Sequence, residues 1–286
     1  MSSGRPSALL PGVVAAFSFG ISNVLGKVAF LAGADVLTLV SFRGVVGVGF
    51  LSLWLRFYPP AARHTPQARR IALGLGLLFA GNVYGVYEAI RLIPVPVAVL
   101  AYFVYPLLTG IVAALTGLER LSPRGVLAAL VAFAGLALMI GAQPGALAPA
   151  GLAWAFAAAC CRTAMLLITR ASLAGAEARL TTWYSLLSST AVLVIVCLVL
   201  RDWTPPLDAP GWAAFVGASI TTTVAVLALF ASAARIGPFR TAVLMNLEPV
   251  VSTVLGLLLV GDSVTPLQLA GGAVMIGALV LFQLRR

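Results

Sequence analysis

Residues 98–117, AVLAYFVYPLLTGIVAALTG, and residues 242–259, AVLMNLEPVVSTVLGLLL, are two versions of one segment. The match extends on both sides, and its anchors are the pairs Arg91/Arg235, Pro94/Pro238, Pro106/Pro249, Glu119/Asp262 and Pro123/Pro266. The offset is 144 positions before the middle of the segment and 143 after it, so one single-residue shift separates the two registers. A repeat of half the chain length in so apolar a sequence indicates a membrane carrier that arose by duplication.

The composition excludes a soluble protein of this length. Of 286 residues, 61% are hydrophobic and 9% are charged, and the mean hydropathy is +1.08. This leaves too little polar surface to cover a globule. The net charge of +10 does not indicate nucleic-acid binding, because the basic residues lie between hydrophobic segments and form no stripe on a soluble domain. The sequence therefore predicts an integral membrane protein.

Ten membrane-spanning helices are predicted when helix ends are placed at charges, prolines and glycines, since about 20 apolar residues cross a bilayer. The expected spans are residues 9–31, 36–55, 71–91, 95–117, 124–141, 150–170, 180–200, 211–234, 239–260 and 265–283. Five spans fall in each half, so we expect two repeats, residues 1–143 and residues 144–286. The predicted fold class is an all-α integral membrane protein.

The basic residues predict the orientation. With a cytoplasmic N-terminus, thirteen arginines lie in the inner loops and termini, whereas Arg91 and Arg201 lie outside. Cytoplasmic loops carry the excess of Lys and Arg in membrane proteins, so both termini are expected in the cytoplasm. Because five is an odd number, the second repeat starts from the opposite side of the membrane. The two five-helix repeats are therefore expected to be inverted.

The repeated segments, with Glu119 and Pro123 after the first and Asp262 and Pro266 after the second, resemble the drug/metabolite transporter superfamily. Within it, the arrangement is similar to the ten-span EamA-type exporters. Residues 86–88, VYE, and residues 101–106, AYFVYP, resemble the YddG-type amino acid exporters, although Tyr105 stands where these have Trp. The resemblance implies export of amino acids, including aromatic and other apolar ones, through a central cavity by alternating access. It also implies a bacterial-type inner (plasma) membrane.

Five ionisable residues fall well inside predicted spans: Lys27, Arg43, Glu88, Arg162 and Glu248. Such residues are costly in hydrocarbon and normally face a cavity or a partner. Counted at about 1.5 Å per residue, the first three lie toward the outside and the last two toward the inside. We hypothesise that Arg43 pairs with Glu88 and Arg162 with Glu248, each pair narrowing one end of the pathway. Structural ion pairs, or snorkelling in the case of Lys27, are the alternative.

Pro106 and Pro249 occupy matching positions in the fourth and ninth predicted spans, where each is expected to kink its helix. Because proline has no N–H, a backbone carbonyl of the preceding turn loses its hydrogen bond. Such a carbonyl is tolerated in a membrane where it faces protein or a water-filled cavity. Tyr105 precedes the first proline and Glu248 the second. An amino acid offers an ammonium group for that carboxylate or for a ring face. Kinks without substrate contact remain the other interpretation.

Aromatic residues gather in the same spans. They are Tyr84, Tyr87, Tyr102, Phe103, Tyr105, Trp154, Trp183 and Tyr184. A cavity lined in this way suits apolar and aromatic side chains, so we expect these residues, except Tyr184, to bind substrate together with Glu88 and Glu248. Asn246 either binds a substrate carboxylate or donates a hydrogen bond to a neighbouring helix.

Competing functions have weaker support in the sequence. The lone histidine, His64, lies in a predicted loop and no HExxH motif is present, so an intramembrane enzyme is not expected. No cofactor and no metal are expected. The sequence contains no phosphate-binding loop, so ATP is not expected to drive transport directly. The expected partners are amino acid substrates and the lipid bilayer, without nucleic acid. Carriage of another metabolite, such as a sugar phosphate or nucleotide sugar, is the alternative that keeps the fold.

Overall fold

The computed structural model describes residues 9–60, 63–93, 98, 101–120, 122–140, 148–201, 203–260 and 265–284. Every regular element in these residues is helical. The elements of the first half are α1 (Leu10–Leu31), α2 (Val36–Phe57), α3 (Pro66–Leu92), α5 (Tyr105–Leu115) and α6 (Pro123–Ile140). Those of the second half are α7 (Pro149–Leu173), α8 (Ala178–Leu200), α9 (Ala209–Ile236), α10 (Pro238–Leu244), α11 (Leu247–Leu255), a π-helical turn at Gly256–Val260 and α12 (Pro266–Leu284).

Six of the described helical segments are long and apolar enough to cross a membrane. They are Leu9–Leu31, Val36–Phe57, Pro149–Leu173, Ala178–Leu200, Ala209–Ile236 and Pro238–Leu259. Shorter apolar helices lie at Tyr105–Leu115, Pro123–Leu138 and Leu269–Ala278. The chain therefore forms a multi-pass membrane protein, and the full number of ten spans stays a prediction.

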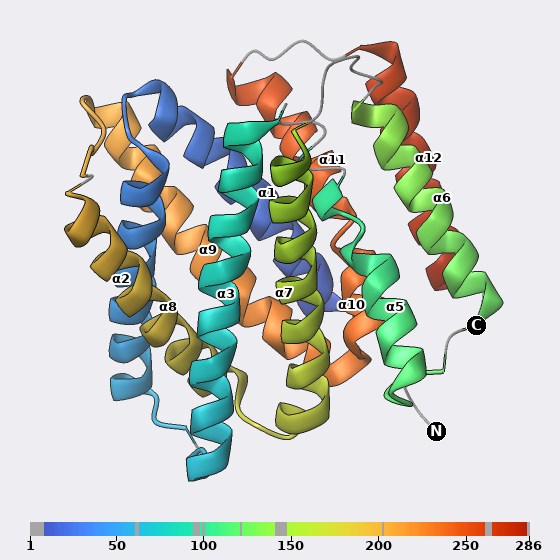
Figure 1. Ribbon diagram of the computed structural model, residues 1–286, viewed down its shortest axis with the longest axis horizontal. Helices are drawn as coiled ribbons and strands as arrows, with labels where there is room; N and C mark the ends of the chain where they lie inside the picture. Colours follow the sequence, from blue (N-terminus) through green and yellow to red (C-terminus); the bar gives the residue numbers. More distant parts are fainter. Residues whose placement is uncertain are drawn as a thin grey trace.

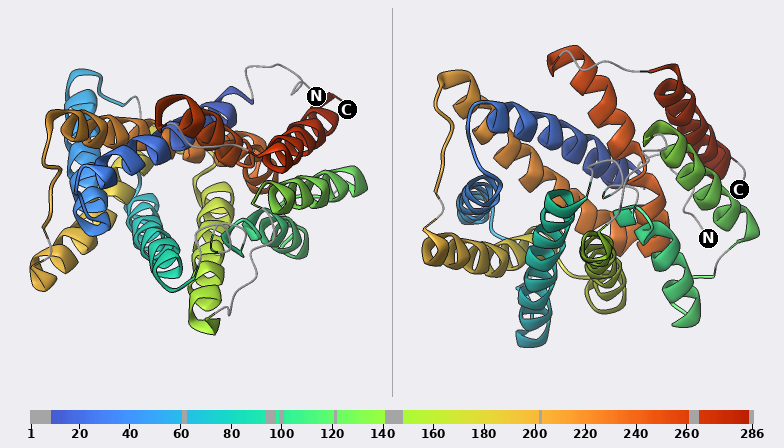
Figure 2. Two further views of the ribbon diagram at one scale, coloured as in Figure 1. Left: turned by 90° about the horizontal axis from the view of Figure 1, so that it is seen from above. Right: turned by 45° about the horizontal axis from the view of Figure 1, so that its top comes forward.

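The closest helix pairs join the first half of the chain to the second. The α1 and α9 helices run side by side behind α3 and α7, and α6 packs along α12 at one edge of the bundle (Figure 1). Seen from above, this last pair extends away from the other helices (Figure 2). The core lies where α1, α3, α7 and α9 meet, so the halves enclose one shared interior.

These contacts are reproduced when each helix is exchanged for its repeat counterpart. The exchange turns α1·α9 into α7·α3 and α2·α9 into α8·α3, and all four pairs are in contact. The pairs α2·α8 and α6·α12 map onto themselves, and both are also present. This pattern is that of two repeats related by a pseudo-twofold axis and fits an inverted repeat.

The two predicted spans that contain the matching prolines are interrupted. The segment predicted as 239–260 is divided into α10 and α11 at Met245 and Asn246, and α5 begins only at Tyr105. Pro106 and Pro249 both lie in the first turn of the helix that follows the break. Proline is tolerated there because the first N–H groups of a helix have no intrahelical acceptor. Each proline thus permits a new helix start, where the sequence predicts a kinked continuous span.

Two serine hydroxyls and one glycine bring α3 and α8 into close contact. Ser185 donates to the carbonyl of Ala72 over 2.8 Å, and Ser188 donates to that of Leu73 over 2.7 Å. Gly76 faces the Ser185 carbonyl so directly that a Cβ atom would overlap it. Small residues and interhelical hydrogen bonds are the usual means by which membrane helices approach one another.

Replacing Gly76 by alanine therefore separates these helices. We expect Gly76→Ala to lower the stability of the detergent-purified protein by about 1–3 kcal/mol, since a backbone carbonyl cannot rotate away as a side chain can. Gly74→Ala is the matched control on the same helix, because nothing lies within 4 Å of its new methyl group. Thermal unfolding measures both variants, and equal melting temperatures would contradict the packing described.

The loop that follows α2 is fixed to the start of α8 through His64. Its Nε2 atom lies 3.0 Å from the Thr181 hydroxyl, and its ring packs on Tyr184. Burial lowers the pKa of His64 below its ordinary 6.5, against the opposing attraction of Glu177. The folded protein thus favours neutral His64.

Protonation of His64 is expected to weaken this contact. A lowered pKa contributes stability that is present above 6.5 and is lost as the pH falls through the folded-state value. We expect the wild-type protein to lose melting temperature relative to His64→Gln between pH 7.5 and pH 5. Parallel pH profiles of the two proteins would show that the His64 contact does not depend on protonation.

Candidate functional site

A buried arginine lies in the middle of the helix bundle. Arg162 of α7 is 3% exposed, and its guanidinium carbon lies 5.0 Å from the ring centre of Phe19 and 5.8 Å from that of Tyr105. Its Nε and Nη1 atoms have no hydrogen-bond partner. A cation inside a membrane-spanning helix is costly, and ring faces compensate only part of that cost. This unsatisfied charge is the centre of the candidate site.

Glu248 provides the opposite charge. It lies in the first turn of α11, where the helix dipole favours a carboxylate, and its Oε1 atom accepts a 3.0 Å hydrogen bond from Nδ2 of Asn23. Arg162 and Glu248 interact electrostatically, but the structure shows no direct ion pair between these two described side chains. The predicted partners are thus brought near one another without touching.

Three aromatic rings of the first repeat form a cluster, and one of them, Tyr105, contacts Arg162. Tyr102, Phe103 and Tyr105 are buried, and their ring centres lie 5.3–5.6 Å apart. Asn82 of α3 donates to the Tyr102 hydroxyl over 3.4 Å and to the Ala158 carbonyl over 2.9 Å. The Tyr105 hydroxyl lies close to Arg162 but makes no hydrogen bond of regular geometry. Buried polar atoms are normally satisfied, so this group of unsatisfied atoms is suited to a polar ligand.

The breaks in the two spans position these side chains. Tyr105 is the first residue of α5, and Glu248 is the second residue of α11. Thr109 and Thr163 both donate to the Tyr105 carbonyl, over 2.7 and 3.3 Å. Asn246 is buried and donates to the Val243 carbonyl over 3.1 Å, so its amide supports the end of α10.

The remaining aromatic candidates form separate groups. Tyr84 and Trp154 contact one another edge to face, with ring centres 5.6 Å apart, and are 46% and 39% exposed. Trp154 precedes Arg162 by eight residues, or about 12 Å along α7. Trp183 packs on Tyr184 and donates from Nε1 to the Ser52 hydroxyl over 2.7 Å. Substrate contact by these rings stays a prediction.

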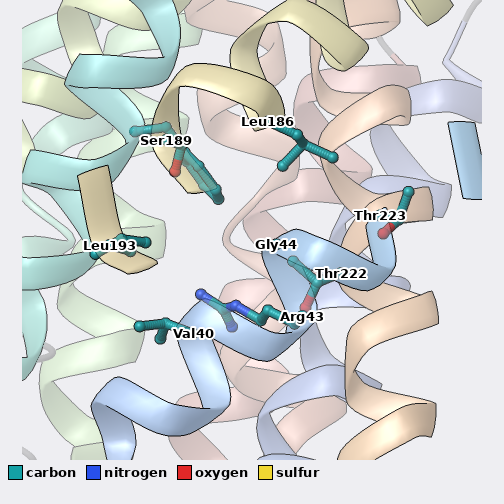
Figure 3. A pocket seen from close by; sticks show the side chains of 9 residues that line it. Val40, Arg43, Gly44, Leu186, Ser189, Leu193, Thr222 and Thr223 are labelled. Atoms are coloured by element: carbon teal, nitrogen blue, oxygen red, sulfur yellow. The ribbon is translucent and has the colours of Figure 1, made fainter. Parts of the chain in front are cut away.

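The other predicted residues lie on α2 and α3. Glu88 makes an interaction within the fold, whereas the Tyr87 side chain lies outside the described part of the structure. Arg43 of α2 lines a small cavity beside α8 and α9 (Figure 3). No contact between Arg43 and Glu88 is seen among the described side chains, so their pairing also stays a prediction. No group of three metal-ligating side chains occurs in the described residues.

Sequence reasoning missed the contribution of α1. Asn23 holds the Glu248 carboxylate, and Phe19 lies under the Arg162 guanidinium. An amide within a predicted span was a detectable signal for Asn23, because polar groups in membrane helices normally have a role. Phe19 had no such signal, since phenylalanine is common in any apolar helix.

A second link between the repeats lies at one end of the bundle. The Oε2 atom of Glu119, in the connection between α5 and α6, accepts a 2.9 Å hydrogen bond from the N–H of Phe239 at the start of α10. Burial raises the pKa of Glu119, and this hydrogen bond together with Arg240 and Arg170 opposes the rise. A cavity of about 220 Å³ lies beside it, lined in part by Arg120.

Comparison with known proteins agrees with this architecture. A model of the EamA-like transporter family matches residues 6–141 and matches again at residues 149–284. A solved structure described only as "Crystal structure of protein" has a TM-score of 0.82 with 22% sequence identity, covering 99% of this chain and 100% of the other. That likeness establishes a shared fold alone. No curated protein matches the sequence.

The two charges of the site are expected to cost stability. In the double variant Arg162→Met/Glu248→Gln, both are removed with little change in volume, and the glutamine can still accept from Asn23. We expect this variant to unfold at the wild-type temperature or above it, with a gain of up to about 4 kcal/mol. Arg162→Met alone should be less stable than the double variant, because the Glu248 carboxylate loses its compensating charge.

Thermal unfolding in detergent compares the wild-type protein with the double variant and with Arg162→Met. The single variant Glu248→Gln completes the double-mutant cycle. A double variant that unfolds well below the wild type would give these charges a structural role and would argue against a binding site.

Proposed function

The chain belongs to the EamA-like transporter family of the drug/metabolite transporter superfamily, whose members are membrane transporters, and we propose that it exports amino acids. Residues 6–141 and 149–284 form its two EamA segments. The observation that carries the proposal is the pair of unpartnered Arg162 nitrogens near the offset carboxylate of Glu248. Opposite charges that are close but not in contact match the two ends of a zwitterion.

The carboxylate of the substrate binds Arg162. A guanidinium donates charge-assisted hydrogen bonds to a carboxylate, and the Nε and Nη1 atoms of Arg162 are two donors without a partner here. Burial strengthens this recognition, because a bound anion compensates a charge that is otherwise uncompensated. The ammonium group binds Glu248, whose second oxygen is not used by Asn23.

The aromatic rings select the substrate side chain. Tyr102, Phe103 and Tyr105 form a continuous buried surface beside Arg162. Such a surface favours apolar and aromatic substrates, since ring stacking adds to the free energy of apolar burial. A sugar phosphate or nucleotide sugar fits less well, because its multiple negative charges would face Glu248 with only Arg162 as the facing cation.

The architecture supports transport by alternating access. We place the protein in a bacterial-type inner membrane with ten spans and both termini in the cytoplasm, as the distribution of basic residues favours. The pseudo-symmetric contacts and the two broken spans support a mechanism in which the repeats exchange conformations around a central site. Each exchange would expose Arg162 and Glu248 to the opposite side.

Counterflow into liposomes tests the proposal. Purified protein in liposomes loaded with unlabelled phenylalanine is expected to accumulate labelled phenylalanine, and Glu248→Gln and Arg162→Lys are each expected to reduce the initial rate at least about tenfold, through loss of a charged contact. Arg69→Gln, at the exposed start of α3, is the matched control and should exchange at the wild-type rate.

Two analogues separate the roles of the charges. Phenylalanine amide lacks the carboxylate and N-acetylphenylalanine lacks the ammonium, so neither should compete in the wild-type protein. Exchange of glucose 6-phosphate but of no amino acid would support the alternative cargo and exclude our assignment.

A further inference from the structure

A carboxylate joins the two repeats at the end of the bundle where α5 ends and α10 begins. Glu119 follows α5, and its Oε2 atom accepts the 2.9 Å hydrogen bond from the Phe239 N–H. Its Oε1 atom lies against the chain at Gly237, where a Cβ atom would overlap it. Gly237 has a φ of +95°, a conformation that glycine adopts readily. The glycine thus lets the carboxylate approach the start of α10.

Two arginines of the second repeat attract the same carboxylate. They are Arg240 of α10 and Arg170 of α7. Arg170 also donates from Nη1 to the Ala234 carbonyl of α9 over 2.6 Å, which holds its side chain between α7 and α9. A hydrogen bond to an ionised acceptor is roughly twice as strong as a neutral one. Glu119 therefore makes a charged contact from the first repeat to α7 and α10 of the second.

The two helices that meet at this contact lead back to the candidate site. The 11 residues of α5 begin with Tyr105, so the helix extends about 16 Å from the site toward Glu119. From Pro238, α10 runs in the opposite sense to Leu244, just before the break that precedes Glu248. The α5 and α10 helices are in contact and lie side by side (Figure 1). Together they separate the site from this end of the bundle.

We propose that the contact of Glu119 with Phe239, Arg170 and Arg240 is an inter-repeat clasp, which keeps the central site closed toward this end and opens once in each transport cycle. The inference rests on the proposed function, because alternating access requires one end of the pathway to part while the other is closed.

The breaks in the spans make such an opening feasible. Short helices that start or stop at a break can move as rigid pieces, since the few residues at the break absorb the change in backbone angles. For α5 and α10 these breaks lie beside Tyr105 and Asn246. One hydrogen bond and two attractions can bias a two-state equilibrium toward the closed form without preventing the open one.

Alkylation of a buried cysteine measures how often this end opens. In the detergent-purified protein, the three native cysteines are replaced by alanine, and Ala242→Cys places one thiol on the buried face of α10. A buried thiol reacts with a maleimide only while it is exposed, so the rate follows the population of the open form. We expect Glu119→Ala to raise this rate at least about tenfold, through loss of a hydrogen bond to a charged group.

Two controls make the result specific to the clasp. Glu177→Ala removes a carboxylate that pairs with Arg179 within the second repeat, so labelling of Ala242→Cys should stay at the wild-type rate. Ala155→Cys places the thiol at a buried position of α7, about 22 Å along the helix from Arg170. Its rate should not rise with Glu119→Ala, because opening at the clasp leaves the other end closed.

A milder variant keeps the test decisive if Glu119→Ala does not fold. Glu119→Gln retains an oxygen acceptor for the Phe239 N–H and loses the charge, so labelling of Ala242→Cys should rise several-fold. Unchanged labelling in the Glu119 variants would overturn the clasp. An equal rise at Ala155→Cys would overturn it as well, by assigning Glu119 to the general stability of the bundle.

The labelling result is separable from the transport assignment, since alkylation needs no substrate. A protein that labels as expected but exchanges no phenylalanine would retain the clasp and lose the proposed cargo. Phenylalanine exchange with unchanged labelling in the Glu119 variants would retain the cargo and overturn the clasp alone.

Discussion

A charge inside the hydrocarbon layer must be compensated within the protein, and the structure is organised around one such charge. Arg162 has ring faces from α1 and α5, and the carboxylate of α11 nearby. These helices reach it because two spans are interrupted beside Tyr105 and Glu248. Continuous helices would satisfy their own backbone and leave no helix start to present a carboxylate. Compensation of this cation therefore connects the broken helices, the aromatic cluster and the binding chemistry.

The two repeats share a backbone plan and differ in the chemistry at its centre. Tyr105 and Glu248 are equivalent in the repeat, each immediately before a matching proline and each in the first turn of a helix. Both lie near Arg162, whose guanidinium is the opposite charge for Glu248 and makes a cation–π contact with the Tyr105 ring. Duplication thus supplied two equivalent positions, and divergence made one of them an aromatic wall and the other an anionic group. A site with two different ends can orient a zwitterion, whereas a strictly symmetric site cannot.

Much of this arrangement could be predicted from the sequence, because hydropathy and the repeat depend on local composition. The membrane class, the duplication and the importance of Pro106 and Pro249 follow from such signals. The interruption of the helices was not predicted, since proline is compatible with both a kink and a new helix start. Phe19 could not be identified because its role depends on which helix face packs against α7. The hydrogen bond between Asn23 and Glu248 joins residues more than 200 positions apart. A single sequence, taken alone, contains no information on such distant pairs.

The interlocked halves also have a consequence for biosynthesis. On α1, the Ser22 hydroxyl bonds with Thr222 and the Ala218 carbonyl of α9, and Asn23 bonds with Glu248 of α11. A ribosome releases α1 long before α9 and α11, at roughly 5–20 residues per second. Throughout that delay these polar groups reside in the membrane without their final partners. The first half therefore reaches its final hydrogen bonding only when the second half has been inserted. Until then, its unpaired polar groups distinguish an unfinished chain from a finished one, and quality-control proteases can recognise that difference.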